Sequence, residues 1–211
     1  SGSSRGGAIM YNAGSSEDSL IIDRSIFMDN YVQTSNNTGR GGAIYAHYGI
    51  TKITNSLISE NRAWRYPGVY AYNGDSLYVE HSTIVNNTSY NTGNGGAADV
   101  YIYGPNNGSY IKNSITDYST YNGNNAPDPV TVSVMSEGSA RFVDPEGGDY
   151  RLSVHSPCIG YGSDTDLIVD LLGNPRINPS NSDPDIGCYE TPLDTAFTAN
   201  AYIYVSSFGS D

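Results

Sequence analysis

The hydrophobic and polar positions of residues 1–126 repeat as a unit that opens with small residues and contains one serine. The serines are 31, 26 and 32 residues apart, and a β-branched aliphatic residue stands three positions before each. The serines are Ser25, Ser56, Ser82 and Ser114, and the aliphatic residues are Ile22, Ile53, Val79 and Ile111. A unit of this length cannot bury its own apolar side chains, so the repeats are expected to stack on one another.

Within each repeat the apolar positions alternate with period two, as in Leu20 and Ile22, followed by Ser25 and Phe27. Such alternation is typical of a strand with one buried face. The change of parity between Ile22 and Ser25 predicts a bend that re-aims the side chains. We therefore expect two or three short strands per repeat, joined by turns rich in Asn and Gly. Such turns are predicted at residues 12–14, 37–39 and 73–75.

Stacked coils of this kind predict an all-β fold, a single-stranded right-handed parallel β-helix over residues 1–139, with equivalent positions about 4.8 Å apart. The serines then form one column and a set of asparagines a second, in which each side chain can bond the next. We interpret both columns as structural rather than catalytic. The asparagines are Asn30, Asn61 and Asn87.

The composition changes after the repeats. Residues 140–190 are rich in Asp and Pro and contain few obvious strands. The end coil of a β-helix exposes unpaired backbone groups and an apolar disc, so this segment is predicted to be an irregular cap. Residues 191–211 are predicted to be a linker followed by one more strand.

The charge and the residue usage restrict the partners and the location. A formal net charge of −12 on 211 residues disfavours nucleic acid and anionic membranes, but leaves cations, glycans and other protein copies. The sequence has no apolar run long enough to span a bilayer, and without an initial Met or signal peptide we read it as a trimmed piece of a longer precursor. Few lysines, two cysteines and four N-x-Ser/Thr sequons favour a secreted or cell-surface protein. The sequons begin at Asn36, Asn86, Asn87 and Asn107.

The second half of the chain carries the most distinctive strings. They resemble the C-terminal end of secreted pectate-lyase-like β-helix proteins of the choice-of-anchor Q type. The coil strings look like those of the same proteins and of polymorphic outer-membrane autotransporter passengers. The resemblance covers about residues 4–190 and implies export, surface attachment and a β-helix, but no single activity. The strings occupy residues 142–145, 148–152, 156–159, 170–176 and 185–190.

Two departures from that family stand out. Cys158 and Cys188 occupy positions where the family usually carries small residues such as Ala, which implies a disulfide pinning the cap; the alternative is two buried free thiols. The final segment looks like the first strand of such a domain. Either the sequence is cut across a tandem array, or this strand pairs head to tail with the next copy. The expected subunit-contact residues are Tyr202, Ile203, Tyr204 and Val205.

Candidate catalytic groups are weak. Pectate lyases of this fold use acidic Ca²⁺ ligands and a basic residue that removes a proton, and no column here stacks carboxylates on adjacent coils. Asp23 and Glu80 share a column with Thr54 between them, so they are weak candidates for lyase or hydrolase chemistry. The three histidines show no metal-ligand spacing. They are His47, His81 and His155.

One acidic run suggests a cation. Asp164, Asp166 and Asp170 alternate and can present oxygens to Ca²⁺, unless they are turn residues. Tyrosines at the coil openings can stack on sugars or on a neighbouring subunit, or can simply be favoured strand residues.

The sequence therefore favours an extracellular structural or adhesive β-helix module, with head-to-tail assembly into a sheath, filament or surface layer as one form of it. The alternatives are a polysaccharide lyase or glycoside hydrolase, and a non-catalytic glycan-binding module.

Overall fold

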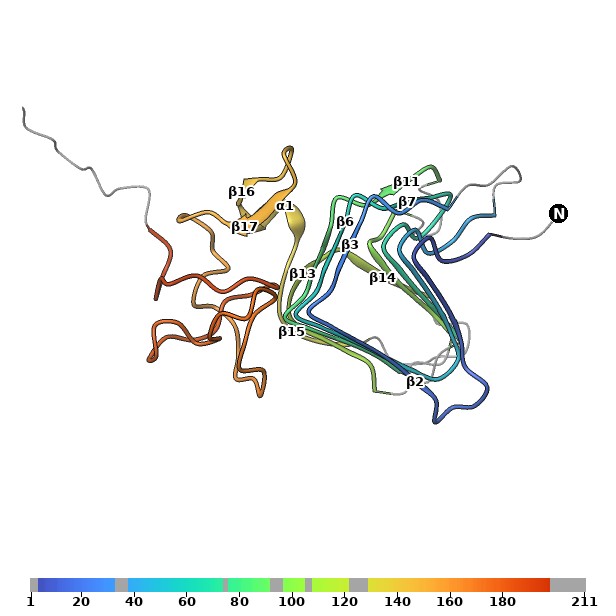
Figure 1. Ribbon diagram of the computed structural model, residues 1–211, viewed down its shortest axis with the longest axis horizontal. Coiled ribbons are helices and arrows are strands. Elements are labelled where there is room, and N and C mark those ends of the chain that lie inside the picture. The colour runs from blue at the N-terminus through green and yellow to red at the C-terminus, as the bar shows by residue number, and fades with distance from the viewer. Residues whose placement is uncertain are drawn as a thin grey trace, which may run out of the picture.

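The computed structural model describes residues 4–32, 38–73, 76–91, 97–104, 108–121 and 129–197. Its coils lie one behind another along the direction of view in Figure 1, and neighbouring coils are joined by parallel strand pairs. The chain is therefore a parallel β-helix, as the repeats predicted.

The coils build two main sheets. The first has five parallel strands in the order β1-β4-β8-β12-β14, and the second begins β2-β5-β9-β13, with β15 paired to β13. The strands of the first sheet are β1 (Ile9–Asn12), β4 (Ile44–His47), β8 (Val69–Tyr72), β12 (Val100–Tyr103) and β14 (Tyr118–Tyr121). Those of the second are β2 (Ser19–Asp23), β5 (Ile50–Thr54), β9 (Ser76–Glu80), β13 (Tyr110–Thr116) and β15 (Val130–Met135).

Shorter strands complete the coils and the C-terminal segment. The second sheet bends through the long strand β13 into a third face. One further pair of short parallel strands joins two neighbouring coils. The third face contains β3 (Ile26–Met28), β6 (Leu57–Ser59) and β10 (Thr83–Val85), and the pair is β7 (Arg62–Ala63) with β11 (Thr88–Ser89). The C-terminal segment, residues 136–197, contains α1 (Glu137–Ala140) and the antiparallel pair β16 (Phe142–Asp144) and β17 (Asp149–Leu152).

One aliphatic column runs through the centre of the stack. Ile22 pairs in register with Ile53, which pairs with Val79, which in turn pairs with Ile111. All four are buried in one hydrophobic cluster. This column confirms the prediction that each repeat shelters its apolar residues against its neighbours.

The parity change next to this column is a backbone bend. The residue before each serine has a positive φ of 44° to 48°, a left-handed conformation that turns the chain from the second sheet to the third face. The four bend residues are Arg24, Asn55, His81 and Asn113.

The serines satisfy the backbone around this bend. Ser82 Oγ donates to the carbonyl oxygen of Glu80 at 3.0 Å and accepts the backbone N–H of Ser56 at 3.3 Å. The same pair of bonds recurs at Ser56 and at Ser114, so the serine column is the predicted ladder. Each hydroxyl group accepts a hydrogen bond from one buried N–H and donates one to a carbonyl oxygen. The bend removes both of these backbone groups from regular strand pairing.

The asparagine column is also a ladder. Asn30 Nδ2 donates to Asn61 Oδ1 at 2.9 Å, and Asn61 Nδ2 donates to Asn87 Oδ1 at 2.8 Å. The buried carboxylate of Asp99 ends the row by accepting from Asn87 at 2.7 Å. Asn87 Nδ2, the atom that would carry a glycan, is thus bonded inside the ladder, which corrects its assignment as a glycosylation site. Asn86 is exposed, whereas Asn36 and Asn107 lie outside the described residues.

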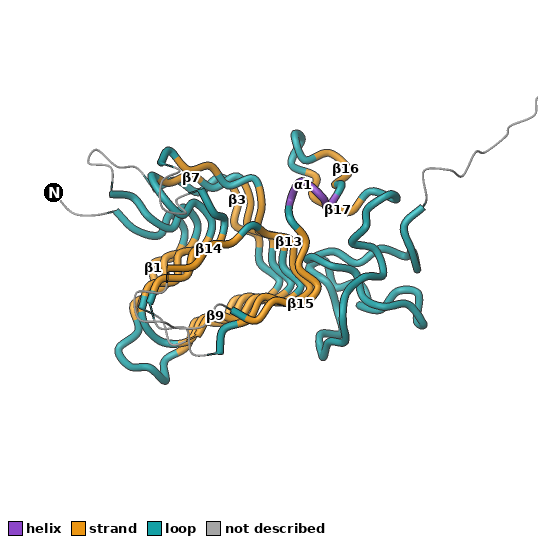
Figure 2. Tube along the Cα trace, turned by 180° about the vertical axis from the view of Figure 1, so that it is seen from behind, coloured by secondary structure: helices purple, strands orange, loops and turns teal. Residues whose placement is uncertain are grey.

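The irregular C-terminal segment is present but covers the side of the coils (Figures 1 and 2). It buries Leu57, Val85 and Ile115, which point outward from three successive coils, in a second hydrophobic cluster. Among the described residues no segment covers the end of the stack, and Thr131, the next position after Ile111 in the core column, is exposed. The prediction of a cap over the end coil is therefore corrected to a lateral support.

The cysteines belong to this second cluster as free thiols. Cys158 and Cys188 are both fully buried and are not joined in a disulfide. The backbone of Cys188 is bonded to Thr83 and Leu171, and that of Cys158 to Ile186, so each thiol is a small side chain filling the apolar interface. Burial raises the pKa of the Cys158 thiol to about 11 and that of Cys188 to about 12. The expected cross-link is thus replaced by packing.

Replacing Ser82 by Ala is expected to lower the free energy of unfolding by about 1–3 kcal/mol, because the buried N–H of Ser56 loses its acceptor. Ser25→Ala is the matched control: Ser25 Oγ donates to the carbonyl oxygen of Asp23 but accepts no backbone N–H from the described residues, so the loss should stay below about 1 kcal/mol. Urea unfolding measures both. Equal losses would contradict a rung-to-rung role for the serine.

Candidate functional site

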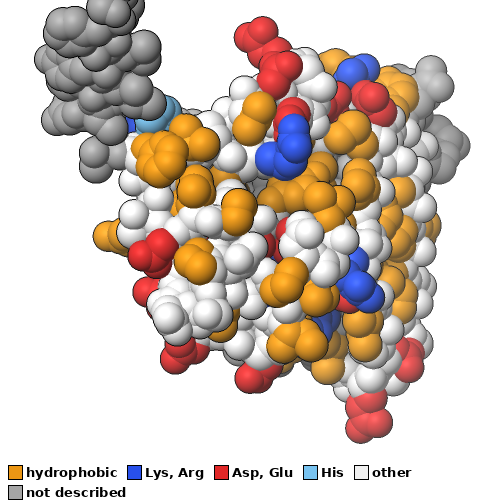
Figure 3. Space-filling view, turned by 60° about the vertical axis from the view of Figure 1, so that its left-hand side comes forward, with side chains coloured by type: hydrophobic (Ala, Val, Ile, Leu, Met, Phe, Trp, Pro, Cys, Tyr) orange, Lys and Arg blue, Asp and Glu red, His pale blue; other side chains and the backbone are white. Residues whose placement is uncertain are grey.

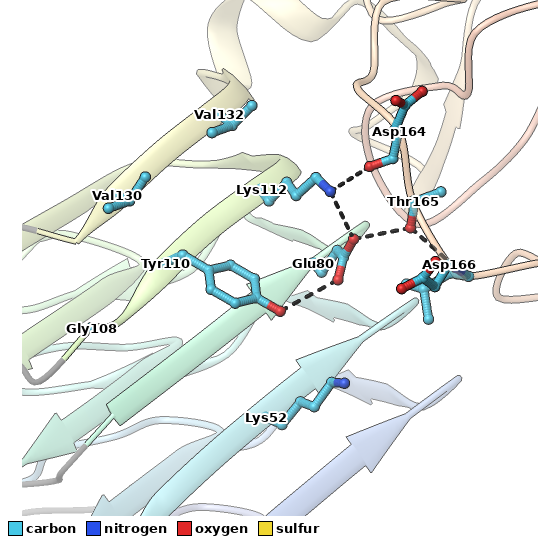
Figure 4. A pocket seen from close by; sticks show the side chains of 11 residues that line it. Lys52, Glu80, Gly108, Tyr110, Lys112, Val130, Val132, Asp164, Thr165 and Asp166 are labelled. Carbon is cyan, nitrogen blue, oxygen red and sulfur yellow. Dashed lines mark hydrogen bonds and ion pairs between the residues drawn. The ribbon is translucent and has the colours of Figure 1, made fainter.

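A groove of about 610 Å³ lies on the outer face of the second sheet, where residues 164–167 of the C-terminal segment form one wall (Figure 4). Period-two alternation places two outward columns on this face. The first runs Ile21, Lys52, Tyr78, Tyr110 and Val130, and the second runs Asp23, Thr54, Glu80, Lys112 and Val132. The middle coils therefore give the groove a polar and aromatic floor, and the last coil gives it an aliphatic edge.

Glu80 is the most connected side chain in the groove. Lys112 Nζ lies 3.6 Å from Glu80 Oε1, and Thr165 Oγ1 donates to the same oxygen at 2.9 Å. Tyr110 donates its hydroxyl to Oε2 at 3.4 Å, and Lys112 also donates to the carbonyl of Asp164. Figure 4 shows these groups converging from the sheet and the wall. Glu80 thus holds the wall against the floor.

Asp23 lies in the column predicted for it, two rungs from Glu80, a separation of about 10 Å. Its carboxylate accepts from Thr54 Oγ1 at 2.8 Å, from Asn55 Nδ2 at 3.3 Å and from Arg24 Nε at 3.2 Å. Burial tends to raise the pKa of Asp23, but these bonds outweigh it and the pKa falls below its usual value. Asp23 does not line the groove, so the two carboxylates have separate surroundings.

The predicted set of three aspartates is divided. Asp164 and Asp166 line the groove. Asp170 is buried and accepts from the backbone N–H groups of Leu172, Asn174 and Glu190. In the part of the chain that the structure describes, no three His, Cys, Asp or Glu side chains are grouped to hold a metal ion. Asp170 therefore organises a turn, and the predicted cation site is not formed by these three residues.

The three histidines lie apart, and His81 has a structural position. Its Nδ1 lies 3.2 Å from the carbonyl oxygen of Asp185, and Asn113 Nδ2 lies 2.9 Å from its Nε2. Asn113 Oδ1 accepts from the backbone N–H of Ser163 at 2.8 Å. Burial and then the charge of Arg176 lower the pKa of His81 to about 2, which keeps the ring neutral. The bend residues thus bind the C-terminal segment that carries the groove wall.

A buried ion pair strengthens the same attachment. Arg176 Nη1 lies 3.0 Å from Glu190 Oε2, and both side chains are fully shielded from solvent. Arg176 Nη2 also donates to Oδ1 of the bend residue Asn55 at 2.9 Å. Removing one partner would leave a buried charge unpaired, so the segment depends on both.

The sequence did not single out Lys52, Tyr110 or Thr165 as groove residues. A signal for the lysine was available, since the chain has two lysines and both lie on outward positions of the second sheet. The sequence carries no comparable signal for Thr165, because the position of this residue depends on the C-terminal segment reaching the sheet.

No protein-family model matches the chain, and no curated protein or solved structure gives a match. Within the described residues, no helix has the length and apolarity needed to cross a membrane. The face in Figure 3 shows many hydrophobic side chains and basic groups at a few separate places.

The neutral His81 predicts acid destabilisation. The unfolded chain takes up a proton at this residue below about pH 6.5 and the folded protein does not, so His81 contributes about 1.4 kcal/mol of destabilisation per pH unit as the pH falls. Glu190, whose pKa burial raises to about 7, contributes with the opposite sign over this range, so the test is the difference in slope between variants. His81→Gln should remove the His81 contribution, whereas His155→Gln, whose ring is exposed, should keep it. Urea unfolding between about pH 7 and pH 4.5 measures it; equal slopes in the two variants would contradict a buried neutral His81.

Proposed function

We propose that this chain is an extracellular structural module that extends a β-helix by stacking end to end, on copies of itself or on tandem domains. The observation that carries the proposal is that the described coils end in open strand edges. β1 and β14 are the outer strands of the first sheet, so each has one unpaired edge. In the second sheet, β2 pairs with β5 and β15 pairs with β13, and no described strand pairs with the other edge of either. Unpaired edges of this kind are templates for strand addition.

The first coil also exposes apolar side chains. Ile9, Leu20 and Phe27 belong to the core cluster but are only partly buried, because no described coil lies beyond them. On the outer faces, Met10, Ile21 and Ile26 are 59%, 68% and 56% exposed. Ile26 continues the column of Leu57, which the C-terminal segment covers in the next coil. A further coil would remove this surface from water.

The proposed location of the module is the cell surface. The sequence resemblance to choice-of-anchor Q proteins and autotransporter passengers supports export, and the net charge of −12 suits solubility outside the cell. The expected contact strand, residues 202–205, lies outside the described residues.

The β2 edge offers a sharp test. Asp18 accepts from the N–H of Ile50, and Arg24 donates to the carbonyl of Thr54, so even-numbered positions bond the second coil. In a parallel strand the alternate positions point the other way, which directs the N–H of Ile21 to the open edge. Ile21→Pro therefore blocks the edge without removing a bond within the stack.

Sedimentation velocity of the wild type should show mass rising with concentration, and negative-stain microscopy should show linear assemblies. Ile21→Pro is expected to remain monomeric with an unchanged circular dichroism spectrum. Ile21→Thr, the control, removes the same exposed side chain but keeps the N–H, so it should still associate. A wild type that is monomeric at all concentrations, or a proline variant that assembles normally, would overturn the proposal.

The groove supports a second candidate, a glycan-acting or glycan-binding module. Its floor joins a tyrosine ring, two lysines and a paired carboxylate, a combination that suits a polar ligand with apolar faces.

For the enzymatic form of this candidate, a reducing-end assay on polyuronides should detect turnover that falls at least tenfold in Glu80→Gln. Tyr78→Phe, which leaves Glu80 and its partners in place, serves as the control and should retain turnover. Absence of turnover by the wild type removes the lyase and hydrolase form, and direct titration with the same polymers then tests binding.

A further inference from the structure

Three arginines form a column at the entrance to the first sheet. The backbone of Arg5 bridges to that of Arg40, and Arg40 bridges to Arg65, so the three occupy equivalent positions on neighbouring coils. Equivalent positions lie about 4.8 Å apart along the stack. The column therefore places three positive charges in a row within a chain whose formal net charge is −12.

Tyrosines hold the guanidinium groups from beneath. The Cζ of Arg5 lies 5.0 Å from the ring centroid of Tyr45, and the Cζ of Arg40 lies 6.0 Å from that of Tyr70. Both rings are nearly fully buried, at 1% and 2% exposure, in an aromatic cluster on the outer face of the sheet. Arg5 and Arg40 thus each lie above a ring of the next coil, an arrangement that orients the planar guanidinium group.

The arginines have no counter-charge in the described part of the chain. None of their guanidinium groups forms a hydrogen bond or an ion pair there, although other arginines of the protein pair with carboxylates. The Nε atoms of Arg5 and Arg65 are buried without a partner. A row of like charges that no internal carboxylate balances is costly to assemble.

We propose that this arginine column binds an acidic glycan, a sugar chain that carries spaced carboxylate or sulfate groups. Guanidinium groups bind such oxyanions through paired hydrogen bonds, and a chain laid parallel to the stack axis passes the three arginines in turn. The buried tyrosine rings position the arginines and do not touch the ligand.

The negative charge of the protein favours a glycan over more densely charged polyanions. Nucleic acid carries a dense row of phosphates, which the formal net charge of −12 on the protein repels. A sugar chain with few anionic groups can bind the arginine column, because little of its negative charge faces the acidic side chains of the rest of the protein.

Isothermal titration of the full chain with hyaluronan oligosaccharides, chondroitin sulfate oligosaccharides and neutral dextran tests the assignment. We expect binding to one or both anionic glycans, weakening as salt is added, and none to dextran. Hyaluronan binding shows that carboxylates suffice, whereas binding restricted to chondroitin sulfate assigns the role to sulfate.

Arg40→Gln should weaken this binding at least tenfold, and Arg40→Lys should weaken it less, because a lysine keeps the charge but loses the paired geometry. Arg62→Gln is the control: it removes the same charge from an exposed arginine on β7. Thermal unfolding verifies that each variant is folded, and Arg5→Gln replaces Arg40→Gln if the latter is not. No binding by the wild type, equal loss in Arg62→Gln, or equally tight binding of polyglutamate would overturn the proposal.

Discussion

The left-handed bend between the second sheet and the third face is the constraint on which the rest of the structure depends. It interrupts regular strand pairing once in each coil, and the serine that follows restores the lost partners through its hydroxyl group. Because the same bond runs from coil to coil, the bend fixes the vertical register of the stack. The central aliphatic column, from Ile22 to Ile111, is buried only when that register holds.

The bend has a second consequence on the outside of the stack. A left-handed residue directs its side chain away from the core, and three of these side chains hold the C-terminal segment. They are Asn55, His81 and Asn113. The segment in turn brings Thr165 to Glu80 and forms the wall of the groove. The local backbone conformation, the lateral support and the candidate site therefore belong to one chain of contacts.

The stack was predictable from sequence because its signals are local. The parity change near Ser25 and the recurring aliphatic residue require no knowledge of distant segments, and both polar ladders follow from them. The lateral support was not predictable: an outward Leu57 looks the same in sequence whether it faces water or a distant segment. For the same reason the cysteine pair suggested a cross-link where the structure has packing. The arginine column was visible as Arg-Gly-Gly-Ala-Ile at residues 5–9 and 40–44, but its missing counter-charges became clear only in three dimensions.

Hydrogen exchange at the backbone amides of Ser56 and Ser82 tests the central claim most directly. Both amides follow a bend, where an ordinary turn would leave them open to water, and in this structure each donates to the serine hydroxyl of the next coil. They should therefore exchange as slowly as the amides of the core strands, such as those of Ile53 and Val79. Exchange at the rate of the amide of Glu17, in an exposed turn, would contradict the rung-to-rung serine ladder and the register that depends on it.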